Sequence, residues 1–591
     1  MILQALYEYY QRKASDPESN IALPGYEWKE IPFIIVIDKN GKFINLEDTR
    51  EGGGKQKVAK RFLVIKSKGR SGKNSYLTTN VLWDHYGYVL AHPKDDTDKA
   101  KDDANKQHKT FVMMVDELVQ ARPDNEEFLA IKYFLESEDG KECVFKHESW
   151  QNCSKISGCN LSFRIIGKKE IAAEHSDLTY YAEVDKRVIE DDSETVEEPA
   201  VSCQGTCLIT GEQGQIAVLH HATSVPGGKS GGKLVGFQKN SGYDSYYKEQ
   251  GLNAPVSKKA EDAYTTALNV LLGKGSQNKF RISDTTIIFW ASRKTEFEKK
   301  ISFFFTNPEK DNPDRNSQEV KALFESIHSG NLNTESETQF YILGLAPNAA
   351  RISVRFWKTG TVKYFAEKIA LHFLDLDIVK PKDEIEYFTL FKLLTSISFD
   401  YKIDNLPPSL AAGIITSILD GAIYPATLQQ QCIRRIKADR KINRTRAAIL
   451  KAYLNRKNRI YQTNEKEITM ALDLLNINQG YLCGRLFAVL EKIQEEALPG
   501  INATIKDRYY GAASSTPVTV FSRLLNLKNH HLAKLNPGRK TNFEKLIQKI
   551  MAGINSNGLP AHLTLDDQSR FAVGYYHQRQ DLFTSKEQKE L

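Results

Sequence analysis

The chain has few cysteines, seven in 591 residues, and no stretch approaches the roughly 18 uninterrupted apolar residues that span a bilayer. An odd and sparse cysteine count favours free thiols in a reducing compartment over a disulfide framework. The first ten residues, MILQALYEYY, lack the basic segment and cleavage site of a secretory signal and instead predict an amphipathic helix. We therefore expect a cytoplasmic protein with no membrane partner.

Signatures of catalysis are also missing from the sequence. There is no adjacent His-Asp pair of the kind used by metal-dependent phosphohydrolases, and there is no HExxH. The segment PGGKSGGK (226–233) approaches a phosphate-binding P-loop, but that motif needs glycine at position 223, where Thr223 stands. A P-loop must also open a helix, whereas a β-like LVGF follows. The sequence therefore predicts a protein without enzymatic activity and without a cofactor.

Cysteine and histidine side chains offer a weak zinc signal. The candidate ligands are Cys153, Cys159, Cys203, Cys207, His220 and His221. Neither cysteine spacing is the tight C-x2-C pair of a zinc knuckle, so small buried thiols are the favoured interpretation. We expect no metal here.

The hydrophobic pattern changes once along the chain. Short β-rich runs stand at 31–38 (IPFIIVID), 215–220 (QIAVLH) and 284–290 (DTTIIFW). After Pro407-Pro408 the apolar residues follow helical spacing instead. One such set is Leu482, Leu486, Val489, Leu490, Ile493 and Ala497. The prediction is an α+β fold, with a mixed α+β region over 1–400 and a basic helical bundle over 405–591.

Two charged, low-complexity stretches interrupt the mixed region. They are KDDTDKAKDDANK (94–106) and EDDSETVEE (190–198). Both contain too few apolar residues to join a core, so we expect mobile loops or linkers there.

Positive charge is concentrated towards the C-terminus. Residues 381–591 carry 30 Lys/Arg against 20 Asp/Glu, whereas residues 1–380 carry 51 against 54. The densest stretch, 432–459, holds eleven basic residues and one acidic residue, Asp439. Because its isoleucines recur at helical spacing, the cations are predicted to line the solvent side. A surface with so little acidic charge is better explained as a phosphate-binding surface than as a solvent-exposed helix face without a ligand.

Two Gly/Lys loops are further candidates for nucleic-acid contact. KSKGRSGKNS (66–75) and the 226–233 segment each combine glycines with cations at short intervals. Glycine lets backbone N–H groups approach phosphates closely. For the second loop, a simple hairpin is an equally good interpretation.

Several motif blocks resemble the large subunit of the subtype I-C CRISPR interference complex, Cascade. The blocks are MILQALYEYY, IPFIIVID, LEDTREG, NVLWDHYGYVL (80–90), CLITGEQGQIAVLH (207–220), KEQGLNAPVS (248–257), AYTTALN, ISDTTIIFWA (282–291), LGLAPNAARISVRFW (343–357) and FAVGYYHQR (571–579). Ten-residue strings of this kind have no generic structural reason to recur. The charged segments 94–106 and 295–335 match no motif of that family.

The resemblance implies a subunit that binds at the 5′ part of the CRISPR guide RNA. There it would read a protospacer-adjacent motif in double-stranded DNA, help to open the duplex and present the displaced strand to a helicase-nuclease. Its other partners would be the Cascade backbone subunits, a guide-end-capping subunit and small subunits. Base pairing with the guide supplies sequence specificity in such complexes, and the protein reads only a short motif.

Reading the duplex motif requires side chains that reach base edges. The predicted residues are Lys68, Arg70, Lys73, Asn74, Lys229, Lys233 and Asn253. For Asn253, a role as a turn former is at least as well supported. The predicted strand-binding residues are Arg434, Arg435, Arg440, Lys441, Arg444 and Arg446. The candidates for stacking on bases are Tyr509, Tyr510, Tyr575 and Tyr576. Paired tyrosines in a helical domain are more often buried in the core or at an interface.

Two other classes of function stay open at this point. One is a nucleic-acid-processing enzyme, either a nuclease or an ATP-dependent remodeller, and the other is a free-standing RNA-binding protein.

The resemblance also implies a small helical subunit translated from an internal start. Of the five methionines, only Met470, expected in the first turn of a helix, leaves a product of suitable size, residues 470–591.

Overall fold

The computed structural model describes residues 1–591 except for 17 segments and single positions. The residues left out are 53–56, 68–69, 71–73, 180–202, 229–231, 239–241, 243–245, 247, 274, 283, 306–321, 323–324, 326–334, 349–350, 382–383, 385–386 and 585–591. The chain forms two compact units. Unit 1 comprises Met1–Ser224 and Lys229–Val270, and unit 2 comprises Val225–Gly228 and Leu271–Leu591. In the described part of the chain, no helix is long and apolar enough to cross a membrane.

Unit 1 mixes strands and helices, as the sequence predicts. Its helices are α1 (Ile2–Ala14), α2 (Tyr86–Leu90), α3 (Asp98–Ala121), α4 (Glu126–Glu136), α5 (Glu138–Lys146), α6 (Trp150–Ser154) and α8 (Lys258–Leu272), the last ending in unit 2. Its strands are β1 (Tyr26–Glu30), β2 (Phe33–Ile37), β3 (Phe43–Asp48), β4 (Arg50–Glu51), β5 (Val58–Ala59), β6 (Arg61–Ile65), β7 (Trp83–His85), β8 (Asn160–Ile165), β9 (Gln204–Thr206) and β10 (Gln213–Gln215). Short 3-10 helices are η1 (Ser75–Leu77), η2 (Ala172–Glu174), η3 (Ser176–Leu178) and η4 (Gln250–Asn253).

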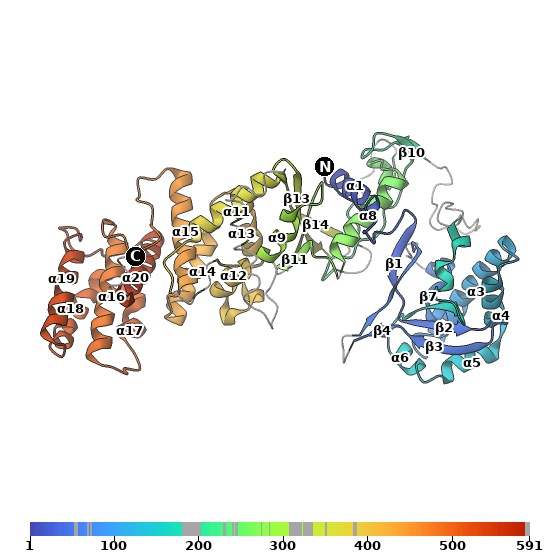
Figure 1. Cartoon of the computed structure of the whole chain (residues 1–591), viewed down its shortest axis with the longest axis horizontal. Helices are drawn as coiled ribbons and strands as arrows, with labels where there is room; N and C mark the ends of the chain where they lie inside the picture. The colour runs from blue at the N-terminus through green and yellow to red at the C-terminus, as the bar shows by residue number, and fades with distance from the viewer. Residues whose placement is uncertain are drawn as a thin grey trace. The chain divides into compact units, whose positions relative to one another are not determined.

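A four-stranded sheet in the order β3-β2-β8-β7 forms the centre of unit 1. Strands β2 and β8 are parallel, and the outer pairs are antiparallel. Every residue of β2 is buried, as expected for an unbroken apolar run in a central strand. Helices α3, α4 and α5 lie beside this sheet (Figure 1), and α4 contacts both central strands. The predicted strand over 31–38 and the predicted first helix are confirmed.

Two local predictions in unit 1 are wrong. The stretch 94–106 is not a loop, because α3 begins at Asp98, where the Thr97 side chain caps it, and includes the rest of that stretch. Ala100 and Ala104 are buried on one side of the helix, so small residues supply the apolar face that a count of charges misses. The run 215–220 forms no strand of its own beyond the end of β10. The second charged stretch, 190–198, lies outside the described residues.

Unit 2 joins a second sheet to a set of helices. Its strands, β11 (Lys279–Ile282), β12 (Thr285–Ala291), β13 (Gln339–Asn348) and β14 (Arg351–Thr361), form one antiparallel sheet in chain order. Its helices are α9 (Glu296–Phe305), α11 (Val362–Leu376), α12 (Leu390–Ile397), α13 (Pro408–Asp420), α14 (Ala426–Asp439), α15 (Arg444–Tyr461), α16 (Gln479–Ala497), α17 (Ile505–Ala513), α18 (Pro517–Leu532), α19 (Pro537–Met551) and α20 (Leu565–Phe583), with 3-10 turns η6 (Phe399–Tyr401) and η7 (Ile403–Asn405). Strand β12 confirms the run at 284–290.

The packing boundary and the compositional boundary of the chain differ. Described residues after 405 form helices and loops only, as predicted. The sheet β11–β14 nevertheless shares one hydrophobic core with those helices, since Phe289, Ile342 and Phe365 belong to the same cluster as Leu486. The compact division therefore falls near residue 270 and not near residue 400.

Helices α16 and α20 cross at very close range. A Cβ atom on Gly484 would lie 2.0 Å from the Phe571 carbonyl oxygen, and one on Gly574 would lie 2.3 Å from that of Tyr481. Only glycine allows this approach, which explains the glycine within FAVGYYHQR. Helix α20 also packs against α15, whereas α16 packs against α18 and α19 on its other side (Figure 1). The predicted apolar face of 482–497 is confirmed, with five of its six members buried.

The α16–α20 contact also contains a histidine that makes the fold sensitive to acid. His577 is buried with Nδ1 2.9 Å from the Tyr481 hydroxyl, and burial lowers its pKa to about 3. Because the folded pKa lies below the unfolded value of about 6.5, protonation favours the unfolded state, and stability falls as pH drops through that window. We expect a loss of roughly 2 kcal/mol from this group between pH 7 and pH 5.

Urea unfolding of the full chain, followed by circular dichroism at both pH values, measures this loss. His577→Gln should flatten the pH dependence. His530→Gln, at an exposed position in α18, is the matched control and should leave it unchanged. If the two variants show the same pH dependence as the wild type, His577 is not the sensitive group.

Candidate nucleic-acid interface

The first Gly/Lys loop is anchored through Arg70. Its guanidinium donates through Nη1 to Asp84 Oδ1 at 2.9 Å, pairs through Nη2 with Asp84 Oδ2, and donates through Nε to the Thr78 carbonyl at 2.8 Å. It also lies over the Tyr88 ring, 4.2 Å from the centroid. Arg70 is thus engaged within the protein, whereas Asn74 is exposed. The predicted partners Lys68 and Lys73 lie outside the described residues.

The second Gly/Lys loop and Asn253 offer fewer accessible side chains to a ligand than the first loop does. Lys233 is half-buried, and burial lowers its pKa below the usual value. Lys229 lies outside the described residues. The Asn253 amide donates to the carbonyls of Lys248 and Gln250 at 2.9 and 3.0 Å, which supports the turn-forming interpretation of this residue.

The basic segment 432–459 differs from its prediction. Its cations do not all line the solvent side, because α15 is enclosed by α11, α12, α14 and α20 and is buried on every face over most of its length. Arg446 has no exposed surface and donates to the carbonyls of Ser396 and Lys441, both at 2.9 Å, besides pairing with Asp439. Arg444 is also buried, with its guanidinium 4.4 Å from the Phe388 ring centroid. The prediction of a solvent-side position is wrong for these two residues.

Further along α15, a single buried carboxylate pairs with two arginines. Asp375 accepts from Arg456 Nε at 2.8 Å and from Arg459 Nη2 at 2.5 Å, and its backbone carbonyl accepts from Lys451. Arg456 also donates to the carbonyls of Ser417 and Ala422. These contacts fix α15 to α11 and to the end of α13, so the cations serve the fold.

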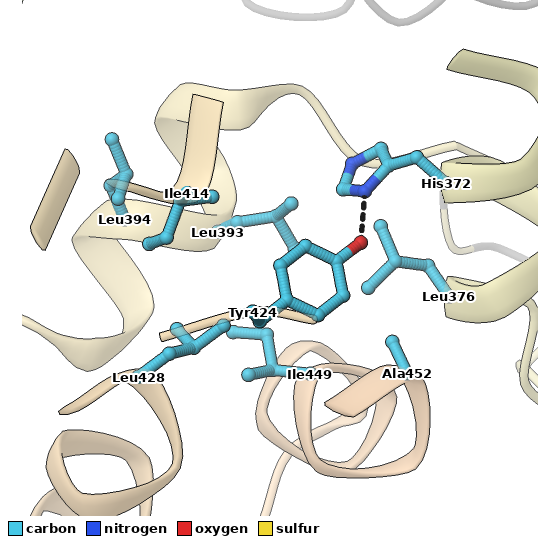
Figure 2. Close-up of a pocket in the computed structure, with 9 residues that line it drawn as sticks. All are labelled: His372, Leu376, Leu393, Leu394, Ile414, Tyr424, Leu428, Ile449 and Ala452. Atoms are coloured by element: carbon cyan, nitrogen blue, oxygen red, sulfur yellow. Dashed lines mark hydrogen bonds between the residues drawn. The ribbon is translucent and has the colours of Figure 1, made fainter. Parts of the chain in front are cut away.

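A small cavity lies beside this network. Figure 2 shows it lined by leucine and isoleucine side chains, with His372 bonded to the Tyr424 hydroxyl. It has room for about one water molecule, and burial holds the pKa of His372 well below its usual range. The cavity is too small and too apolar to bind a nucleotide.

Three predicted strand-binding cations remain accessible. Arg434, Arg440 and Lys441 are exposed around the C-terminal end of α14. Arg435 is partly buried and pairs with Asp439. The accessible part of the predicted surface is therefore smaller than the sequence suggests.

A second set of exposed cations, not singled out from the sequence, lies on α18, on α19 and on the connector between them. Residues 517–551 hold seven Lys/Arg and one acidic residue, Glu544. The α18–α19 cations, defined as Arg523, Lys534, Lys540, Lys545 and Lys549, are exposed, and none pairs with a carboxylate in the part of the chain described. The charge count of residues 517–551 could have indicated these cations from the sequence, but the prediction followed the denser segment 432–459 instead.

Of the four tyrosines considered for stacking, three belong to the core. Tyr510, Tyr575 and Tyr576 are buried, and the Tyr576 hydroxyl donates to the Val379 carbonyl at 2.8 Å. Tyr509 is partly exposed, with the Arg523 guanidinium 5.7 Å from its ring centroid. Tyr509 is therefore the one of the four placed beside an exposed cation.

Three of the six candidate zinc ligands have other partners. His221 Nδ1 lies 2.7 Å from Glu261, and His220 bonds to the Tyr264 hydroxyl. The Cys207 sulfur accepts from the backbone N–H of Ser257, and hydrogen bonding of this kind lowers its pKa to about 7 against the opposing effect of burial. Over the described residues, no group of three or more His, Cys, Asp or Glu side chains is arranged to hold a metal ion.

Comparison with known proteins places this geometry in a family. No curated protein matches the chain in sequence. The sequence profile of a family described as "CRISPR-associated protein (Cas_Csd1)" matches residues 6–583, which is nearly the whole chain and spans both units. The chain therefore belongs to this family of CRISPR-associated proteins.

Proposed function

We propose that the chain is the non-catalytic large subunit of a subtype I-C CRISPR RNA-guided DNA surveillance complex. It reads the protospacer-adjacent motif in duplex DNA, assists R-loop formation and presents the displaced strand to a helicase-nuclease. The observation that carries this proposal is the family match over residues 6–583. The partners are the guide RNA, the target duplex, the Cascade backbone subunits, the guide-end-capping subunit and the small subunits.

The accessible polar and cationic side chains support different roles for the two units, with duplex contact in unit 1 and strand contact in unit 2. In unit 1, the anchored loop around Arg70 carries the exposed amide of Asn74, a side chain that can pair with a base edge in a duplex groove. In unit 2, the α18–α19 cations and the three exposed cations at the end of α14 offer a surface for a strand of any sequence. Side chains that bind phosphates need no sequence information, since pairing with the guide supplies it.

Replacing Lys68, Lys73 and Asn74 together by Ala tests the motif-reading role. In the assembled complex, binding of a motif-bearing duplex should weaken about tenfold or more, because base-edge contacts discriminate by about 1–3 kcal/mol each. Binding of a target opened beforehand over the guide-matching region should hardly change, since guide pairing remains available. Equilibrium titration of both DNAs measures the difference.

The matched control replaces Lys101, Asn105 and Lys109 by Ala. These residues have the same chemistry and are exposed on α3, away from the loop in sequence. Both DNAs should bind this control as they bind the wild type. Equal loss on both DNAs for the loop variant would assign the loop to general backbone contact or to folding, and not to motif reading.

The internal start at Met470 gives a separate expectation. Met470 does not lie in the first turn of a helix, as expected from sequence, but in the connector between α15 and α16. A product of residues 470–591 would therefore contain α16 to α20 without cutting any helix. We expect mass spectrometry of the purified complex to find this product, and Met470→Leu to abolish it. Met551→Leu should have no effect, and a fragment unaltered by Met470→Leu would contradict the idea.

A further inference from the structure

The Asp84 carboxylate is the centre of a clamp beneath the first basic loop. Asp84 is 1% exposed and accepts hydrogen bonds from the Arg70 guanidinium, the backbone N–H groups of Asn80 and His85, and the Thr79 hydroxyl. A buried carboxylate with so many donors has one stable position. Arg70 is therefore fixed to β7 and, through the Thr78 carbonyl, to the segment that precedes it.

Tyr88 extends this clamp to the other end of the loop. Its ring supports the Arg70 guanidinium, and its hydroxyl donates to the Ser75 carbonyl at 2.9 Å. Burial raises the pKa of Tyr88 to about 12, so the hydroxyl stays a donor at physiological pH. In turn, α3 fixes Tyr88, because His108 Nδ1 lies 2.7 Å from its carbonyl oxygen.

Asn74 is the polar side chain that this clamp leaves outside. It precedes η1, and its backbone carbonyl accepts from the Leu77 N–H at 3.0 Å. Its amide makes no cap for η1 and has no hydrogen-bond partner among the described residues. An exposed amide next to a fixed backbone is suited to pair with the edge of an adenine, which offers one donor and one acceptor in the major groove.

We propose that Arg70, Asp84 and Tyr88 are positioning residues that hold Asn74 for contact with a base edge in duplex DNA, and that Arg70 itself does not contact DNA. This inference rests on the proposed reading of a duplex motif. It assigns the arginine of the basic loop to contacts within the protein and the asparagine to contact with the ligand.

Arg70→Ala and Arg70→Lys in the assembled complex test the clamp. Both variants should bind a motif-bearing duplex about tenfold more weakly and a pre-opened target normally, because lysine keeps the charge but cannot form the two-bond fork with Asp84. Hydrogen exchange at the Leu77 and Thr78 amides should accelerate in both. A direct phosphate contact would instead be largely preserved in Arg70→Lys.

Arg50→Ala and Arg50→Lys are the matched controls. Arg50 forms the same kind of fork with Asp48, at 2.8 and 2.7 Å, and lies over the Phe33 ring in the same unit. Its loss should lower stability to a similar degree while leaving motif binding unchanged. If the Arg50 variants show the same selective DNA defect, general destabilisation explains the result and the clamp is wrong.

Four other outcomes would also overturn the clamp. Arg70→Lys binding like wild type while Arg70→Ala fails would make Arg70 a direct contact. Unchanged exchange at Leu77 would show that Arg70 does not fix the loop. If both Arg70 variants bind like the wild type while the Lys68, Lys73 and Asn74 variant has a selective defect, the clamp proposal fails and the proposed motif reading stands. If that loop variant shows no selective defect, the proposed motif reading fails and the clamp fails with it.

Discussion

Replacing Asp375 by Asn is expected to lower the free energy of unfolding of unit 2 by about 3–5 kcal/mol, because it leaves two arginines without their shared carboxylate. Asp375 and Arg456 are both buried, so water cannot replace the lost partner. Arg456 would retain the carbonyls of Ser417 and Ala422 and its contact with the Tyr424 ring, but no carboxylate to balance its charge. Urea unfolding of the full chain, followed by circular dichroism, measures the loss.

Asp400→Asn is the control for this prediction. Asp400 pairs with Lys402 on the surface, where both side chains are mostly exposed, so its loss should cost at most about 1 kcal/mol. A similar small effect for Asp375→Asn would contradict the account of α15 as a helix held by buried ion pairs. It would also reopen the assignment of the 432–459 cations to strand binding.

Replacing Lys534, Lys540, Lys545 and Lys549 by Ala is expected to weaken binding of single-stranded DNA to the full chain by at least tenfold at low salt. Each cation that contacts a phosphate releases counterions, at about 0.7 per contact for single strands. The slope of log affinity against log salt should therefore fall by roughly 3. Titration of a labelled oligonucleotide between about 50 and 200 mM salt measures both quantities.

The control replaces four lysines that already have acidic partners. Lys39, Lys106, Lys132 and Lys146 pair with Glu126, Asp102, Asp116 and Glu142. Their removal changes the net charge equally, so it should leave the salt slope nearly unchanged. An equal fall in slope for both sets would mean that total charge, and not the α18–α19 cations, governs binding.

Regular apolar patterns were sufficient to predict much of the fold. The buried strand at 31–38 and the helix at 482–497 could be predicted because a single face or a whole run of apolar residues specifies each one. Residues 94–106 were misassigned because Ala100 and Ala104 form a buried stripe that charge counting conceals. The division near residue 270 could not be predicted, since it depends on which helices cover the second sheet.

The candidate site was harder to predict because charge does not reveal exposure. Arg446 and Arg456 are buried because carbonyl oxygens and the carboxylates of Asp439 and Asp375 accept their hydrogen bonds. Carboxylates are sparse near these arginines in the sequence, and Asp375 is distant from Arg456, so a count of local charge does not reveal the pairing. Arg70 belongs to the predicted Gly/Lys loop, but the sequence does not show that Asp84, in β7, is its partner. The α18–α19 cations become apparent once the helices show which lysines lack acidic neighbours.

The most direct test of the central claim compares the assembled complex with and without this chain on three DNAs. These are a duplex with the motif, the same duplex with the motif altered, and a target opened beforehand. We predict that removal of the chain abolishes discrimination between the two duplexes, while guide-dependent binding of the opened target persists. If the complex without the chain still discriminates between the duplexes as well as the complete one, the chain does not read the motif.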